Sequence, residues 1–145
     1  MDNAERKLWH KGPNYTADAV IINTTEQKIL LIQREDTEQW ALPGGFVDED
    51  ETPLQAVQRE AFEETGLVIT TSDKDLVYQG PVEDPRNSDT AWIETSGYLF
   101  RLTAELEATA GDDAKSAQWT PLDTLPELYG SHQQIVENAL RSLDN

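Results

Sequence analysis

Three glutamates stand close together near the middle of the chain, at a spacing that suits metal-ion chemistry. Between Arg59 and Glu64, the acidic residues are Glu60, Glu63 and Glu64. Residues three and four apart share one face of a helix, so these carboxylates point together. Each like-charged pair costs an isolated helix roughly 0.2 to 0.5 kcal/mol, and the negative end of the helix dipole adds to that cost. We therefore expect a hard cation here, Mg²⁺ with Mn²⁺ as a substitute.

The surroundings of this cluster argue against an ordinary solvated acidic face. Upstream, residues 42–45 read Leu-Pro-Gly-Gly, which predicts a loop whose glycines let the backbone approach an ion or a phosphate closely. Glu51 and Arg59 flank the start and the middle of the acidic segment. The sequence therefore predicts a loop and a helix that act together on a charged ligand.

The helix that must position the glutamates has clear ends in the sequence. Thr52 is the expected N-cap, Pro53 the first helical residue, and Gln55 the partner that completes a capping box. Gly66 follows the last predicted turn, where a glycine commonly ends a helix. These signals predict a helix over residues 52–64.

Runs of β-branched and aromatic residues predict strands around this helix. The expected strands are 17–23, 28–34, 67–71, 75–79, 92–102 and 117–121, with a turn at 24–27. A second capping box, from Ser131 to Gln134, opens a C-terminal helix whose apolar residues recur at helical spacing as far as Leu143. This order predicts an α/β sandwich with a mixed sheet in a single domain, residues 1–145.

Composition bounds the class of protein. The chain has no cysteine, which excludes a thiol nucleophile and a thiolate zinc site, and it has neither a membrane-length apolar run nor a secretory leader. We expect a cytoplasmic protein. The net charge of −17 repels nucleic acid and anionic membranes, so neither is an expected partner. The acidity indicates either a solvated surface with some carboxylates committed to metal or an adaptation to high salt.

The acidic motif and its loop, taken together, resemble the Nudix box, from Gly45 through Glu51 and Arg59 to Leu67. The resemblance implies a Nudix-type α/β/α sandwich and a loop-helix-loop that holds divalent ions while a nucleoside diphosphate linkage is hydrolysed. It implies that Arg59 and Glu51 form an ion pair that holds the loop against the helix. The metal ligands that it implies are Glu60, Glu64 and the main-chain carbonyl of Gly44, with Glu63 as a third carboxylate ligand or as a partner of Arg59.

Hydrolysis also needs a group that takes a proton from the attacking water. Glu63 and Glu64 are candidates for this general base. Asp112 and Asp113 are the others, because Nudix enzymes often place a late acidic residue in such a loop. The alternative interpretation of this Asp-Asp pair is a simple turn. The sequence leaves the choice open.

Other segments resemble the ADP-ribose pyrophosphatases of the mitochondrial type and the ADP-ribose sensor domain of melastatin channels. They are 12–14, 17–18, 84–87, 89–92, 94–95, 110–114, 128–129 and 132. The resemblance implies that Arg86 contacts phosphate, and that Asp84 contacts a ribose hydroxyl or Arg86 itself. It also implies that Tyr129 borders the terminal ribose with His132 beside it. Arg34 is a further phosphate candidate, and packing is the alternative role for Tyr129, His132 and Arg34.

Three functions remain compatible with the sequence. The first is hydrolysis of ADP-ribose to AMP and ribose 5-phosphate. The second is another Nudix activity, on nucleoside triphosphates or on a different nucleoside diphosphate sugar. The third is a sensor module without catalysis, which the intact Arg-Glu-x-x-Glu-Glu cluster disfavours. The expected partner is a small nucleotide, and the resemblance leaves both a monomer and a homodimer open.

Overall fold

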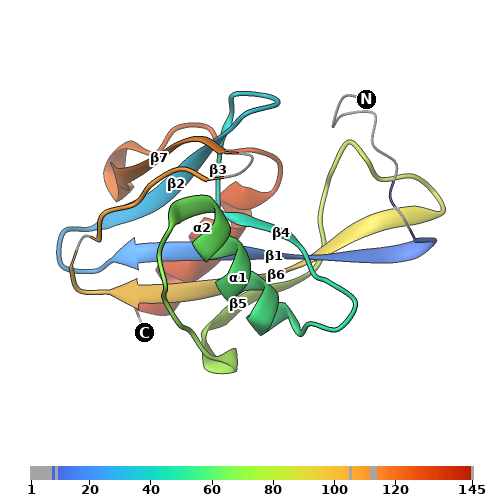
Figure 1. The fold of residues 1–145 in the computed structure, drawn as a ribbon, viewed down its shortest axis with the longest axis horizontal. Coiled ribbons are helices and arrows are strands. Elements are labelled where there is room, and N and C mark those ends of the chain that lie inside the picture. Colours follow the sequence, from blue (N-terminus) through green and yellow to red (C-terminus); the bar gives the residue numbers. More distant parts are fainter. Residues whose placement is uncertain (1–7, 9, 105, 112–113, 145) are drawn as a thin grey trace.

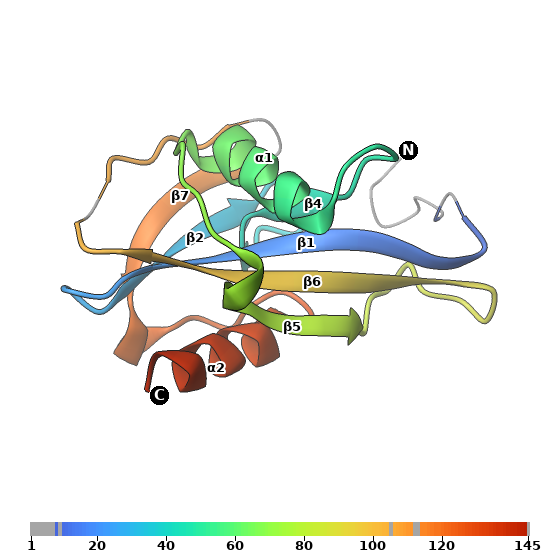
Figure 2. The same ribbon diagram turned by 90° about the horizontal axis from the view of Figure 1, so that it is seen from below.

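A mixed sheet carries helices on both of its faces in the described part of the chain (Figures 1 and 2). The computed structural model describes residues 8, 10–104, 106–111 and 114–144. In chain order, the strands and α-helices are β1 (Gly12–Asn23), β2 (Lys28–Arg34), β3 (Trp40–Ala41), β4 (Gly44–Phe46), α1 (Pro53–Thr65), β5 (Leu76–Pro81), β6 (Ala91–Leu102), β7 (Ala114–Pro121) and α2 (His132–Leu143).

The centre of the sheet is a long parallel pair made by strands that are distant in the sequence. β1 pairs with β6 along its whole length, and the order of the main sheet is β3-β2-β1-β6-β5. β4 pairs with β1 and β7 pairs with β2, both antiparallel. Figure 2 shows α1 on one side of the sheet and α2 on the other. The predicted α/β/α sandwich with a mixed sheet is confirmed.

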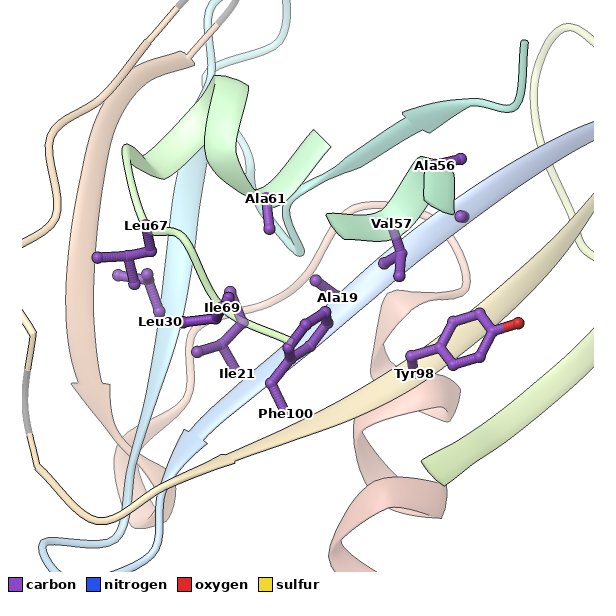
Figure 3. Packing of buried hydrophobic residues seen from close by; sticks show 11 residues of the cluster. Ala19, Ile21, Leu30, Ala56, Val57, Ala61, Leu67, Ile69, Tyr98 and Phe100 are labelled. Carbon is purple, nitrogen blue, oxygen red and sulfur yellow. The ribbon is translucent and has the colours of Figure 1, made fainter. Parts of the chain in front are cut away.

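Helix α1 begins and ends at the residues that its sequence signals indicate. The Thr52 side chain accepts from the Gln55 amide, the Gln55 side chain accepts from the Thr52 amide, and Gly66 takes a left-handed conformation with φ of 76°. The apolar face of the helix packs on β1 and β6, as Figure 3 shows for Val57 and Ala61. Glu64 is buried together with Val57 and Ala61, so it lies on the same inward-facing side of α1.

Three local predictions were wrong. Residues 67–71 alternate between buried and exposed side chains, but they form no strand, and the Thr71 amide bonds to the Gln58 side chain instead. Ser131 makes no side-chain capping bond, because the turn from Tyr129 to His132 starts α2. The predicted loop at residues 42–45 contributes instead to β4, since Gly44 and Gly45 pair with β1.

Candidate active site

Arg59 is the centre of the acidic cluster. Its guanidinium forms two bonds with Glu51, of 2.7 and 2.9 Å, and its Nη1 lies 2.7 Å from Glu60 and 3.1 Å from both carboxylate oxygens of Glu63. Its Nη2 also donates to the carbonyl of Phe46, at 3.0 Å. The hydrogen bonds that Arg59 donates to Glu51 raise the pKa of Arg59 and lower the pKa of Glu51. The predicted ion pair between loop and helix is therefore present.

Two glycines of β4 let this strand lie directly against the helix carboxylates. The Gly44 amide donates to Glu64 Oε1 at 2.8 Å, and the whole Glu64 residue is 7% exposed. A Cβ on Gly45 would lie 2.6 to 2.7 Å from the carboxylate atoms of Glu60. Burial raises the pKa of Glu60, and Arg59 offsets part of that effect. The carboxylates of Glu60 and Glu64 therefore lie close to the backbone of β4, with little access to water.

The carboxylates of α1 are ligands that suit a hard divalent ion, although their side chains do not converge on one point. Among the described residues, no three acidic or imidazole side chains are arranged as ligands of one ion. The reason is that Glu60 and Glu63 turn to Arg59, whereas Glu64 turns to the Gly44 amide. Carboxylate oxygens on one helix face, with glycine backbone against them, are nevertheless the ligands that Mg²⁺ and Mn²⁺ prefer.

A single cavity of about 800 Å³ brings the acidic helix together with most of the other predicted site residues. The predicted residues that line it are Arg34, Gly44, Arg59, Glu60, Glu63, Glu64, Asp84, Arg86, Tyr129 and His132. Glu51 lies outside this lining and acts through Arg59. Asp112 and Asp113 lie outside the described residues. Just before them, the Gly111 amide donates to the main-chain carbonyl of Glu64, at the end of α1.

Two arginines on the cavity wall are each held between a carboxylate and an aromatic ring. Arg86 bonds to both oxygens of Asp84 at 2.9 and 3.0 Å, and its guanidinium carbon lies 5.3 Å from the centre of the Phe46 ring. Burial alone would raise the pKa of Asp84, but its bonds with Arg86 lower it. Arg34 bonds to both oxygens of Asp36 at 3.0 and 2.8 Å. The rigid fork of each arginine is thus oriented before any ligand arrives.

Tyr129 and His132 stand at the start of α2. The Arg34 guanidinium carbon lies 4.1 Å from the centre of the Tyr129 ring, a cation–π contact, and the rings of Tyr129 and His132 meet edge to face at 5.8 Å. Burial raises the pKa of Tyr129 and lowers that of His132. The structure therefore places Tyr129 beside Arg34, and the role of Tyr129 at the terminal ribose stays a prediction.

Of two neighbouring residues on β6, one lines the cavity. Ile93 is 2% exposed and lines it, whereas Trp92 lies outside the lining and donates its indole N–H to Glu94. Sequence reasoning included Asp18 in a segment that carries the resemblance but gave no role to this buried carboxylate on the cavity wall. An acidic residue within the otherwise apolar run of β1 was the signal that could have found it.

Comparison with known proteins shows the family of this chain. The model of the family described as the NUDIX domain matches residues 12–139. The chain therefore belongs to the Nudix family, and the predicted family is confirmed. No helix among the described residues is long and apolar enough to cross a membrane.

Particular relatives include two ADP-ribose pyrophosphatases. The protein from Methanocaldococcus jannaschii is 39% identical over 89% of this chain and 74% of its own length. The mitochondrial protein from Rattus norvegicus is 30% identical over 87% of this chain, which spans 47% of that protein. Among solved structures, the NUDIX domain of Shewanella oneidensis NrtR, complexed with ADP ribose, is 27% identical. It superposes with a TM-score of 0.75 over 99% of this chain and 94% of that domain.

Proposed function

We propose that this protein hydrolyses the diphosphate bond of ADP-ribose to AMP and ribose 5-phosphate with the help of Mg²⁺. The observation that carries the proposal is that the three glutamates of α1 and two oriented arginines line one cavity. The ADP-ribose pyrophosphatases among the relatives support the same choice of substrate. Because this chain spans about half of the rat protein, the likeness supports the activity without establishing it.

The acidic helix is the proposed place for the metal. Glu60, Glu63, Glu64 and the carbonyl of Gly44 would hold it. When bound, a divalent ion neutralises phosphate oxygens and lowers the pKa of a water molecule. The surplus of carboxylates over arginines in the cavity lining supports the need for added positive charge, since an anion would otherwise be repelled.

The protein's own residues position the substrate and manage the proton. Arg34 and Arg86 bind phosphate oxygens with forks that Asp36 and Asp84 already hold in place, so little side-chain entropy is lost on binding. Tyr129 borders the same wall and contributes an apolar face to the sugar side of the ligand. A carboxylate then takes the proton of the attacking water. The candidates remain Glu63, Glu64, Asp112 and Asp113.

The proposed substrate can be tested with a panel. Purified protein would be assayed with ADP-ribose, NADH, diadenosine polyphosphates, nucleoside triphosphates and UDP-glucose, each with Mg²⁺ and with EDTA. We expect AMP and ribose 5-phosphate from ADP-ribose, and no turnover in EDTA. Faster cleavage of a nucleoside triphosphate would contradict the proposed substrate, and full activity in EDTA would contradict the metal.

Replacing Arg86 by alanine is expected to raise KM for ADP-ribose more than it changes kcat. A charge-assisted bond to phosphate accounts for a rise of about 10-fold to 100-fold. Arg101→Ala is a matched control, because this half-exposed arginine pairs with Asp75 outside the cavity. Steady-state kinetics of both variants would decide the point. An unchanged KM in Arg86→Ala would show that the arginine is structural.

A further inference from the structure

The cavity contains a buried carboxylate that the proposed roles leave unused. Asp18 lies on β1 and is 7% exposed, and it lines the cavity together with Gly44, Thr95 and His132. Its Oδ2 accepts a bond of 2.6 Å from the Thr95 hydroxyl, which fixes the orientation of the carboxylate. A Cβ on Gly44 would lie 2.5 Å from Oδ1, so the glycine leaves that oxygen uncovered. Asp18 thus presents one oxygen to the cavity.

His132 presents a donor beside that oxygen. The Leu42 amide donates to Nδ1 at 3.0 Å, so Nδ1 carries no proton and a neutral imidazole carries it on Nε2. Burial lowers the pKa of His132, which keeps the ring neutral near pH 7. Nε2 lies 3.6 Å from Asp18 Oδ1, which is longer than a hydrogen bond.

These two atoms form an acceptor and a donor that do not satisfy each other. Among the described residues, neither Asp18 Oδ1 nor His132 Nε2 has a hydrogen-bond partner, and neither belongs to the buried atoms that lack one. Both atoms are therefore reachable from the cavity. An oxygen atom can lie within hydrogen-bond distance of both atoms at once, because they are only 3.6 Å apart.

We propose that Asp18 and His132 form a subsite for a sugar hydroxyl of the substrate. A hydroxyl donates one bond and accepts others, so it can donate to Asp18 Oδ1 and accept from His132 Nε2. A phosphate oxygen only accepts and would be repelled by the carboxylate, whereas an ammonium group only donates and would face the N–H of the ring. The subsite thus favours a hydroxyl group over a phosphate or an ammonium group. This inference rests on the proposed function, because it assumes a nucleoside diphosphate sugar.

The position of the subsite relates it to the acidic helix. Gly44 contacts Asp18 on one side, and its amide donates to Glu64 on the other. Gly44 therefore lies between Asp18, which would bind the hydroxyl, and Glu64, a proposed metal ligand. Asp18 is a specificity-determining residue in this arrangement, because a misplaced sugar would also misplace the adjoining phosphate. The ribose of the adenosine and the terminal ribose are the two sources of such a hydroxyl.

Calorimetric titration with ligands that cannot be hydrolysed tests the proposal. The probes are α,β-methylene ADP-ribose, α,β-methylene ADP, which lacks the terminal ribose, and a methylene ADP-ribose built on 2′,3′-dideoxyadenosine, all in Mg²⁺. Asp18→Ala should weaken binding of the first probe by about 10-fold to 100-fold, the effect of a lost charge-assisted bond. It should leave unchanged the affinity for the analogue that lacks the recognised hydroxyl, and that analogue identifies which ribose binds.

Two more variants separate the loss of a hydroxyl contact from misfolding and from a general change of charge. Asp18→Asn retains the size of the side chain and its bond with Thr95, so it should fold and show a smaller loss with the same ligand preference. Asp73→Asn removes one charge from an exposed position outside the cavity, and it should bind all three probes as the wild type does. Thermal melts would verify that each variant is folded.

Each of the other possible results would refute either the hydroxyl subsite or the proposed function. Equal losses for all three probes, or no loss for Asp18→Ala, would refute the hydroxyl subsite while leaving the proposed function intact. A parallel loss of Mg²⁺ affinity without nucleotide would make Asp18 a metal ligand and would also refute the subsite. If the wild type failed to bind methylene ADP-ribose, the proposed function would fall, and the subsite with it.

Discussion

Replacing Glu64 by glutamine is expected to lower kcat for ADP-ribose by about 10²-fold to 10⁴-fold, the scale of a lost metal or proton-transfer role. The substitution removes a charge that the proposed metal requires. It retains a carbonyl oxygen that can accept from the Gly44 amide, so the contact between loop and helix is preserved. Single-turnover and steady-state kinetics with Mg²⁺ would measure the change.

Glu137→Gln on α2 is a suitable control for this substitution. Glu137 is exposed and lies outside the cavity, so the variant has the same loss of charge without a change at the site. We expect wild-type kinetics from the control and a normal melting temperature from both variants. If Glu64→Gln retained near wild-type activity, the assignment of Glu64 to the metal would be wrong.

Millimolar Mg²⁺ is expected to raise the melting temperature of the wild type far more effectively than NaCl at the same concentration. An ion that binds only the native site adds about 2.7 kcal/mol when its concentration is 100 times Kd. For a chain of this size, each kcal/mol corresponds to roughly 2 to 4 °C. The physical reason is the repulsion among Glu60, Glu63 and Glu64, which a bound cation relieves. Thermal melts over a range of MgCl₂ concentrations would measure the gain.

The double variant Glu60→Gln, Glu64→Gln separates this effect from general screening. Both proteins should be stabilised by NaCl, because 28 acidic side chains against 11 basic ones make the folded state repel itself. Only the wild type should gain strongly from Mg²⁺. A flat response of the wild type to Mg²⁺ would leave the acidic cluster without its cation and would contradict the proposed hydrolysis.

The sequence predicted well those features whose causes are local. The boundaries of β2 were predicted correctly. The caps of α1 were also predicted correctly, because a capping box, an N1 proline and a C-terminal glycine act within a few residues of the helix ends. The ion pair of Arg59 with Glu51 was implied by the resemblance to the Nudix box, and the structure contains it.

Features that depend on tertiary contacts were not predictable in the same way. β3 and β4 have two and three residues, which is too few for a periodic signal in the sequence. They form because β3 pairs with β2 and β4 pairs with β1. Residues 67–71 show the opposite case, since their alternating burial is that of a strand although no neighbouring strand pairs with them. The contact of Asp18 with His132 joins β1 to α2, and no local pattern connects these elements.

The parallel pairing of β1 with β6 also determines when the cavity can appear during folding. Residues 24–90 separate these strands, and α1 lies between them in sequence. Pairing between such distant segments is slow because a long loop must close first, whereas the caps of α1 are local and can form early. A nascent chain that ends before Ala91 therefore contains the whole acidic motif but lacks one of the strands on which α1 packs. We therefore expect α1 to form before the cavity is complete.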